Sequence, residues 1–203
     1  MIVIGLTGGI GTGKSEVARI LSELGAVIIN ADQVGHQAYT PQTETWREVV
    51  KAFGEDILQA NGEIDRRKLG GIVFADPEQL TRLNQIMHPR LARLVAARIE
   101  ELRRQPIPAI VVEAAILFEA NWEPLVEEVW TIEAPESTVI QRLQARNGWD
   151  ANEIRKRVNA QLPSSERSAR ADVVLENSGD LDRLERQVKS LWESRVERRI
   201  EQK

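Results

Sequence analysis

The chain has 203 residues, of which 42% are hydrophobic and 29% charged, and its formal net charge is −4. This balance is typical of a folded chain rather than a disordered one, and it excludes a globally basic surface for DNA or RNA. Because cysteine is absent and neither a signal peptide nor an apolar stretch of about 18 residues is found, we expect a cytoplasmic protein without disulfides, thiolate chemistry or membrane contact.

The first residues combine a strand with a phosphate-binding loop. Ile2–Leu6 is a short apolar run typical of a buried parallel strand, and Gly8–Ser15 fits the pattern G-x-x-x-x-G-K-[ST]. Glycines bring backbone N–H groups close to phosphate oxygens, and the following helix adds its N-terminal donors. Lys14 is expected to reach the β- and γ-phosphates, and Ser15 to bind Mg²⁺. The predicted nucleotide-binding residues of this segment are Gly8, Gly9, Ile10, Gly11, Thr12, Gly13, Lys14, Ser15 and Glu16.

The next elements predict a βαβ unit. Lys14–Leu24 carries apolar residues at helical spacing, and Ala26–Asn30 is a second apolar strand, so the sheet should be parallel. Ligands bind at the carboxyl ends of such strands, and Asp32 follows the second strand closely. Asp32 is therefore a candidate for the site, although capping a helix over Gln33–Tyr39 would be a simpler role.

Residues 43–105 contain no strong strand pattern and are expected to be mainly helical. Helical spacing is found over Thr43–Phe53, Asp65–Ala75 and Arg90–Arg104. Asp76-Pro77 indicates a helix start, whereas His88-Pro89 predicts a break, because proline pushes the preceding residue out of the helical region. This helical insert could form a lid or the wall of a substrate site.

Three further strands and a basic segment follow. Strands are predicted within Pro108–Glu113, Glu128–Ile132 and Ala171–Leu175. Glu113 ends its strand, where an acid could organise Mg²⁺ or simply be solvated. Residues 142–170 hold seven basic side chains, which could form a lid over the transferred phosphate or a solvated face: Arg142, Arg146, Arg155, Lys156, Arg157, Arg167 and Arg170. A closing helix over residues 180–203 is expected to fray from Glu193 onward.

Several of these segments together resemble the dephospho-coenzyme A kinase family. The matching segments occur in the family's order: Gly5–Ser15, Leu83–Pro89, Ile116–Glu119, Arg142–Arg146, Arg157–Gln161 and Ala171–Gly179. The family's Asp-Ala-Asp triplet corresponds here to Asn30-Ala31-Asp32, and Ala115 replaces a proline. Unlike the acid it replaces, the Asn30 amide cannot take a proton or carry charge.

The resemblance implies Mg²⁺- and ATP-dependent phosphorylation of the ribose 3′-hydroxyl of dephospho-coenzyme A, which gives coenzyme A. It also implies a P-loop NTPase fold, a three-layer α/β/α arrangement with a central parallel five-stranded sheet, a helical acceptor-side insert and a helical lid. Residues 1–203 are then one kinase domain, with the core at about 1–40, 106–140 and 170–203, the insert at about 41–105 and the lid at about 141–169.

The resemblance also implies residue roles. Asp32 is the expected catalytic base, and Lys14 and Arg142 act on the phosphates. ATP contacts are further expected from Arg142, Arg146, Asn177 and Gly179. The acceptor-binding residues would be Asp32, His88, Leu117, Phe118, Glu119 and Arg66. The alternatives are a P-loop kinase of another small molecule or nucleoside, or a regulatory NTPase, although the chain lacks the guanine motif N-K-x-D. We expect a monomer.

Overall fold

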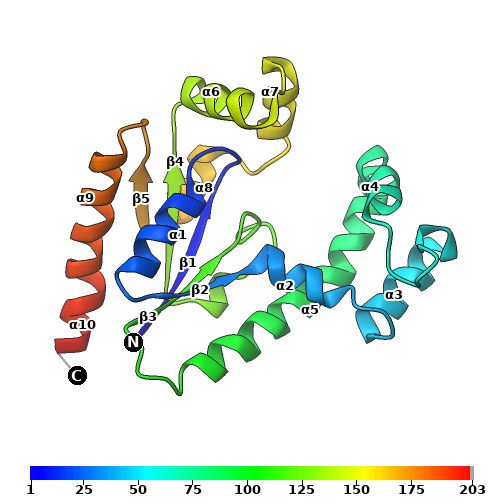
Figure 1. Cartoon of the computed structure of the whole chain (residues 1–203), viewed down its shortest axis with the longest axis horizontal. Coiled ribbons are helices and arrows are strands. Elements are labelled where there is room, and N and C mark those ends of the chain that lie inside the picture. The colour runs from blue at the N-terminus through cyan, green and yellow to red at the C-terminus, as the bar shows by residue number, and fades with distance from the viewer. Residues whose placement is uncertain (202–203) are drawn as a thin grey trace. The chain divides into compact units, whose positions relative to one another are not determined.

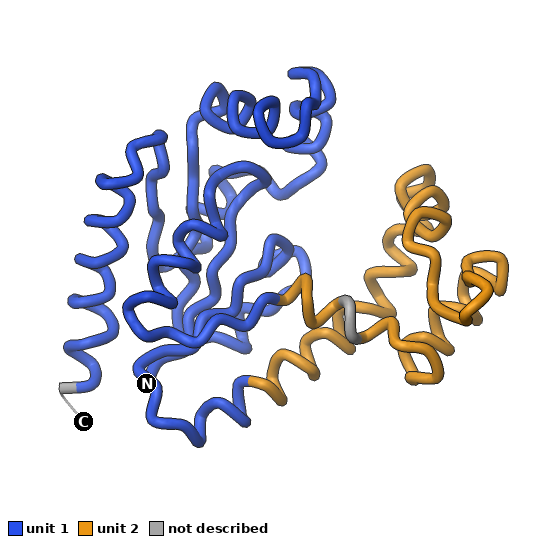
Figure 2. The backbone as a smooth tube through the Cα atoms, viewed as in Figure 1, with its two compact units in different colours: residues 1–30, 99–203 blue, residues 31–98 orange. Residues whose placement is uncertain are grey.

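A computed structural model describes residues 1–201, apart from the side chains of residues 36, 37 and 201. The chain divides into two compact units, one formed by residues 1–30 with the segment from 99 onward and the other by residues 31–98 (Figure 2). The predicted division into core, insert and lid stays a prediction. No helix within the described residues is long and apolar enough to cross a membrane.

The first unit is built on a five-stranded sheet in which every strand pair is parallel. Its strands follow the order β2-β3-β1-β4-β5, which confirms the predicted sheet (Figure 1). The strand bounds are β1 Ile2–Gly8, β2 Val27–Asn30, β3 Ala109–Glu113, β4 Glu128–Glu133 and β5 Val173–Glu176. Because the strands are parallel, their last residues gather at one edge of the sheet.

Helices flank this sheet. Alternate residues of β1, such as Ile2 and Ile4, are buried in a cluster with α1 (Lys14–Glu23) and α9 (Leu181–Trp192). The other face of β1 meets residues 114–126, since Leu117 packs closely against Gly5. Full burial of each such aliphatic side chain contributes about 1.5–3 kcal/mol, so these apolar runs hold the sheet between its flanking layers.

The segment between β4 and β5 is helical. It consists of α6 (Glu136–Asn147), α7 (Ala151–Asn159) and α8 (Ser164–Arg170). Buried Val139, Leu143 and Ile154 form a small core between α6 and α7. In Figure 1, α6 and α7 lie beyond the edge where the strands end.

The end of the chain is more ordered than expected. After α9, the chain forms a π-helical turn (Glu193–Glu197) and α10 (Arg198–Glu201). Val196 is fully buried, and Arg199 donates a hydrogen bond of 2.9 Å to Glu128. The predicted fraying is therefore wrong as far as Glu201, because the charged tail supplies the partner of a buried carboxylate.

The second unit is helical, as predicted. Its elements are α2 (Ala31–Ala38), α3 (Glu44–Phe53), a 3₁₀ turn (Glu55–Ile57), α4 (Arg66–Ala75) and α5 (Pro77–Leu102), whose last residues belong to the first unit. Because α2 begins at Ala31, Asp32 lies in its first turn and not at the cap position expected before Gln33.

The predicted break at His88-Pro89 is wrong, because α5 continues through Pro89. Proline within a helix costs about 3 kcal/mol through its missing N–H and its ring. On both sides of Pro89, however, every fourth residue is buried: Leu83, Met87, Leu91 and Val95. Burial of this stripe outweighs the local cost, since each side chain contributes about 1.5–3 kcal/mol.

Candidate active site

The phosphate loop connects β1 to α1 and depends on its glycines. Gly13 has a φ of +103°, and a Cβ atom there would lie 2.1 Å from the Asn177 amide nitrogen. Gly11 has a φ of +77°, and its Cβ would press on Leu143 at 3.1 Å. Larger residues would therefore meet both backbone strain and a steric clash. Thr12, which is buried, closes the turn by donating a hydrogen bond of 2.9 Å to the Gly9 carbonyl.

Two side chains bind the carbonyl groups of this loop. Arg142 donates to the carbonyls of Gly11 (3.3 Å) and Thr12 (3.2 Å) and to the Asn177 amide oxygen (2.8 Å). Asn177, in turn, donates to the Thr12 carbonyl at 2.8 Å. Anions bind at backbone N–H groups, so fixing the carbonyls presets the loop for phosphate. The direct ATP contacts predicted for Arg142 and Asn177 stay predictions.

The start of the loop lies against the segment that follows α7. The Ile10 N–H donates a hydrogen bond of 2.8 Å to the Gln161 side chain. Arg167 is 6% exposed, pairs with Glu133 at 3.2 Å, and would lie 3.1 Å from a Cβ atom on Gly9. These residues line a cavity of about 480 Å³. Gly9 and Ile10 were predicted as site residues. Glu133, Gln161 and Arg167 were not, although Arg167 belongs to the basic segment and Gln161 to a segment that matches the family.

At the adjacent strand ends, polar side chains converge on Glu113. The Ser15 hydroxyl donates to Glu113 Oε1 at 3.0 Å, and the Asn30 amide donates to Glu113 Oε2 at 3.1 Å. Glu113 is only 8% exposed, so the alternative of a solvated strand-end acid is wrong. The hydroxyl and the carboxylate are hard oxygen donors, which suit Mg²⁺.

Lys14 arches back over the loop and donates to the Gly8 carbonyl at 3.2 Å.

Within the described residues, no group of three or more His, Asp or Glu side chains could hold a metal by itself. Mg²⁺ usually takes one or two protein oxygens and fills its other positions with phosphate and water.

The acceptor residues predicted in the first unit have other partners. Leu117 and Phe118 are buried, Leu117 against Gly5 and Phe118 under the Arg170 guanidinium, 4.5 Å from the ring centre. Glu119 accepts a hydrogen bond of 3.3 Å from the Leu162 N–H. Their contacts with an acceptor stay predictions.

Two predicted ATP contacts also lie apart from the loop's hydrogen bonds. Arg146 is exposed and donates to the Asn147 side chain. Gly179, with a φ of +114°, belongs to the turn after β5. Both assignments stay predictions.

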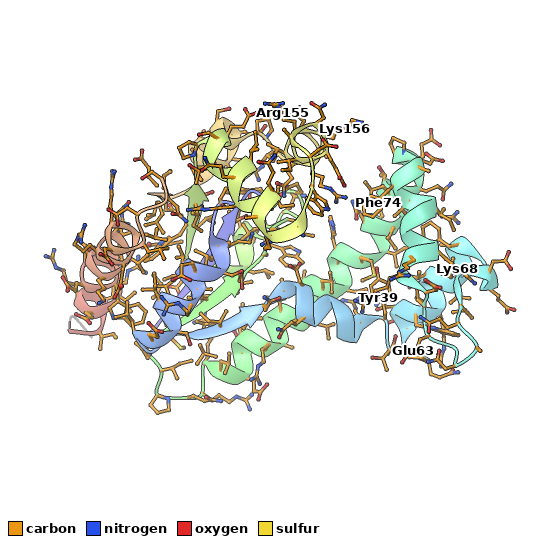
Figure 3. All side chains as sticks on the ribbon, turned by 45° about the horizontal axis from the view of Figure 1, so that its top comes forward. Tyr39, Glu63, Lys68, Phe74, Arg155 and Lys156 are labelled. Atoms are coloured by element: carbon orange, nitrogen blue, oxygen red, sulfur yellow. The ribbon has the colours of Figure 1, made fainter. Side chains whose placement is uncertain are left out.

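The second unit contains three of the predicted acceptor residues. His88 lies within α5, and Asp32 is exposed in the first turn of α2. Arg66 lines a cavity of about 720 Å³ together with Tyr39 and Glu63, which Figure 3 labels. The Arg66 guanidinium lies 5.8 Å from the centre of the Tyr39 ring. Burial raises the pKa of Tyr39, so its hydroxyl stays protonated at neutral pH and can donate a hydrogen bond.

Comparisons with known proteins assign the chain to a family. The family model described as dephospho-CoA kinase matches residues 2–183. A dephospho-CoA kinase from Geobacter sulfurreducens is 45% identical over 195 residues, which cover 96% of this chain and 99% of that protein. Another, from Carboxydothermus hydrogenoformans, is 44% identical over 92% of this chain and 90% of its own length.

Solved structures show the same fold. A protein from Thermus thermophilus is 36% identical and superposes with a TM-score of 0.79 over 96% of this chain and 98% of its own. A dephospho-CoA kinase from Campylobacter jejuni, at 23% identity, superposes with a TM-score of 0.73 over 96% and 97% of the two chains.

Proposed function

The chain belongs to the dephospho-CoA kinase family, whose activity is the last step of coenzyme A biosynthesis, and from this premise we propose how its residues act. The reaction transfers the γ-phosphoryl group of ATP to the ribose 3′-hydroxyl of dephospho-CoA. The observation that carries the proposal is the pairing of the phosphate loop with Glu113 through Ser15, at 3.0 Å. A nucleotide-phosphate cradle and an oxygen donor pair for its metal thus lie at one sheet edge.

The donor half of the site is the loop together with α1. Backbone N–H groups from Gly9 to Ser15 bind the β- and γ-phosphates, aided by the positive end of the α1 dipole. Lys14 exchanges the Gly8 carbonyl for phosphate oxygens when ATP binds. Arg142 and Asn177 keep the loop in shape by holding its carbonyls. Arg142, Arg146, Asn177 and Gly179 would in addition contact ATP directly.

Ser15 and Glu113 would hold Mg²⁺, which, when bound, neutralises charge on the β- and γ-phosphates. Glu113 would contribute Oε1, the oxygen that accepts the Ser15 hydrogen bond. Both residues come from rigid elements, the first turn of α1 and the end of β3, so the donor positions are preset.

The acceptor half involves Asp32. As the 3′-oxygen forms its bond to the γ-phosphorus, the bond from that phosphorus to the β,γ-bridging oxygen of ATP breaks, and Asp32 accepts the hydroxyl proton. The products are ADP and coenzyme A. In the second unit, Arg66 and the protonated Tyr39 hydroxyl offer a cation and a donor for phosphate oxygens of the acceptor.

A coupled assay of ADP formation tests the proposal, with dephospho-CoA and a panel of nucleosides as separate acceptors. We expect turnover with dephospho-CoA to exceed that with every nucleoside. Preference for a nucleoside would indicate a small-molecule kinase of another kind, and slow ATP hydrolysis that no acceptor stimulates would indicate a regulatory NTPase. The monomeric state and the cytoplasmic location remain predictions.

A further inference from the structure

Asn30 is the last residue of β2, and its side chain has a defined partner. Its Nδ2 atom lies 3.1 Å from Glu113 Oε2. The other oxygen of the same carboxylate, Oε1, accepts the Ser15 hydroxyl at 3.0 Å. A chain of two hydrogen bonds therefore runs from the end of β2 through Glu113 to the first turn of α1.

The sheet itself brings these groups together. In the parallel pairing of β2 with β3, Asn30 lies opposite Glu113, and in the pairing of β1 with β3, Glu113 lies opposite Leu6. Asn30, the donor, and Glu113, the acceptor, thus come from neighbouring strands that are hydrogen-bonded to each other. The contact is fixed by strand register and does not depend on a loop.

Residue type matters at this position. The Nδ2 group of an amide can only donate, and a carboxylate can only accept, so Asn30 and Glu113 form a matched pair with one negative charge. Aspartate at position 30 could not donate while ionised, and it would place a second negative charge about 3 Å from the first, which repels it unless a cation lies between them. The amide therefore orients Glu113 without needing a metal.

We propose that Asn30 is a positioning residue for the Mg²⁺ site. Its amide holds Glu113 Oε2 and so keeps Oε1 directed at Ser15. The side chains that meet the metal are then oriented before Mg²⁺ and nucleotide arrive. Asn30 acts through Glu113 and touches no reacting atom. The inference rests on the proposed function, because it assumes that Ser15 and Glu113 receive the metal of Mg·ATP.

Hydrogen-bond partners of metal-binding groups typically change metal affinity by about 10–100-fold when they are removed. The test measures Mn²⁺ binding to the full chain in the presence of ADP, through the electron paramagnetic resonance signal of free Mn²⁺, so no turnover is needed. Asn30→Ala removes the donor. We expect it to weaken Mn²⁺ binding by about tenfold, while ADP affinity without metal stays within about twofold of the unmodified chain.

A double-mutant cycle separates this role from general damage. If Asn30 acts through Glu113, Asn30→Ala combined with Glu113→Ala should bind Mn²⁺ no more weakly than Glu113→Ala alone. Asn30→Leu, which removes the donor and keeps the volume, should repeat the effect of Asn30→Ala. Asn152→Ala, at an exposed position of α7, is the matched control and should leave Mn²⁺ affinity unchanged.

Two results would overturn the inference while leaving the proposed function intact. One is Mn²⁺ affinity within twofold of the unmodified chain in both Asn30 variants. The other is a double variant weakened by the full product of the two single effects. If the unmodified chain itself fails to bind Mn²⁺ together with ADP, the assumed metal site is wrong and the proposed function loses its support.

Discussion

Asp32 lies exposed in the first turn of α2, two residues after the end of β2. A carboxylate there stabilises the helix N-terminus whatever else it does, typically by about 0.3–1 kcal/mol. The proposed role as a base adds a separate demand, because the side chain must take a proton. The amide of asparagine can accept a hydrogen bond but cannot do this, so one substitution separates the two roles.

We expect Asp32→Asn to lower turnover by about 100-fold or more, since a positioned base typically contributes a factor of 10² to 10⁴. ATP affinity should change by less than about twofold, because the phosphate loop is untouched. Steady-state kinetics and equilibrium binding of ATP measure the two quantities. Asp182→Asn is the matched control, as Asp182 is an exposed acid in the first turn of α9. Turnover near that of the unmodified chain would remove Asp32 from the role of base.

At single residues, a sequence pattern predicts chemistry best where the spacing itself creates the site. Lys14 and Ser15 were predicted this way, because the loop and the helix start are continuous in sequence. Glu113 was left open between two roles; its burial beside Ser15 excludes the solvated one, and its role toward Mg²⁺ stays a proposal. Gln161 and Asn30 escaped assignment because their roles depend on partners 151 and 83 residues away in the chain.

At the scale of elements, the loop and α1 depend on the turn that follows β5. Asn177 is 2% exposed and fills the space in which a side chain at Gly13 would stand. Its amide nitrogen also binds the Thr12 carbonyl. The absence of a side chain at Gly13 is therefore a packing requirement as well as a conformational one.

Gly13→Ala should lower ATP affinity by more than about tenfold, because anion binding needs the backbone geometry that the clash at 2.1 Å would disturb. Gly62→Ala is the matched control: Gly62 also has positive φ, but nothing lies within 4 Å of its Cβ position. That control should lose about 1–2 kcal/mol of stability from backbone strain alone and keep its ATP affinity. Titration calorimetry and urea unfolding give both values. Equal ATP affinities in the two variants would show that the Asn177 contact does not shape the loop.

Element prediction succeeded where one local signal dominated. All five strands were predicted because short apolar runs ended at turn residues or acids. The break predicted at Pro89 was wrong because proline removes only one backbone hydrogen bond of the helix. Four buried side chains, spaced four residues apart, stabilise the helix on both sides of Pro89. The fraying predicted from Glu193 onward was wrong because the prediction rested on composition alone. Its charged residues predicted exposure to solvent. Arg199 instead donates a hydrogen bond to the carboxylate of Glu128, which is buried and distant in sequence.

At the scale of the whole molecule, the two compact units carry different parts of the proposed chemistry. Residues 1–30 and 99 onward include the phosphate loop, Ser15 and Glu113, whereas residues 31–98 include Asp32 and the cavity lined by Arg66. If this division matches the two substrates, each ligand by itself should protect a different set of backbone amides from hydrogen exchange. Protection reports local stability, so it assigns a ligand to a unit without turnover.

We expect Mg·ADP to slow exchange at residues 8–16 and to leave residues 39–41 and 59–67 unchanged. Dephospho-CoA alone should slow exchange at 39–41 and 59–67, the segments that line the second unit's cavity, by about tenfold or more if binding is near saturation at 10-fold its Kd. Arg66→Ala should abolish this second effect and retain the first, because it removes the cavity's cation over Tyr39. Mass spectrometry of peptic fragments measures both. If saturating dephospho-CoA leaves 39–41 and 59–67 unprotected in an active enzyme, the acceptor binds elsewhere and the assignment of Arg66 is wrong.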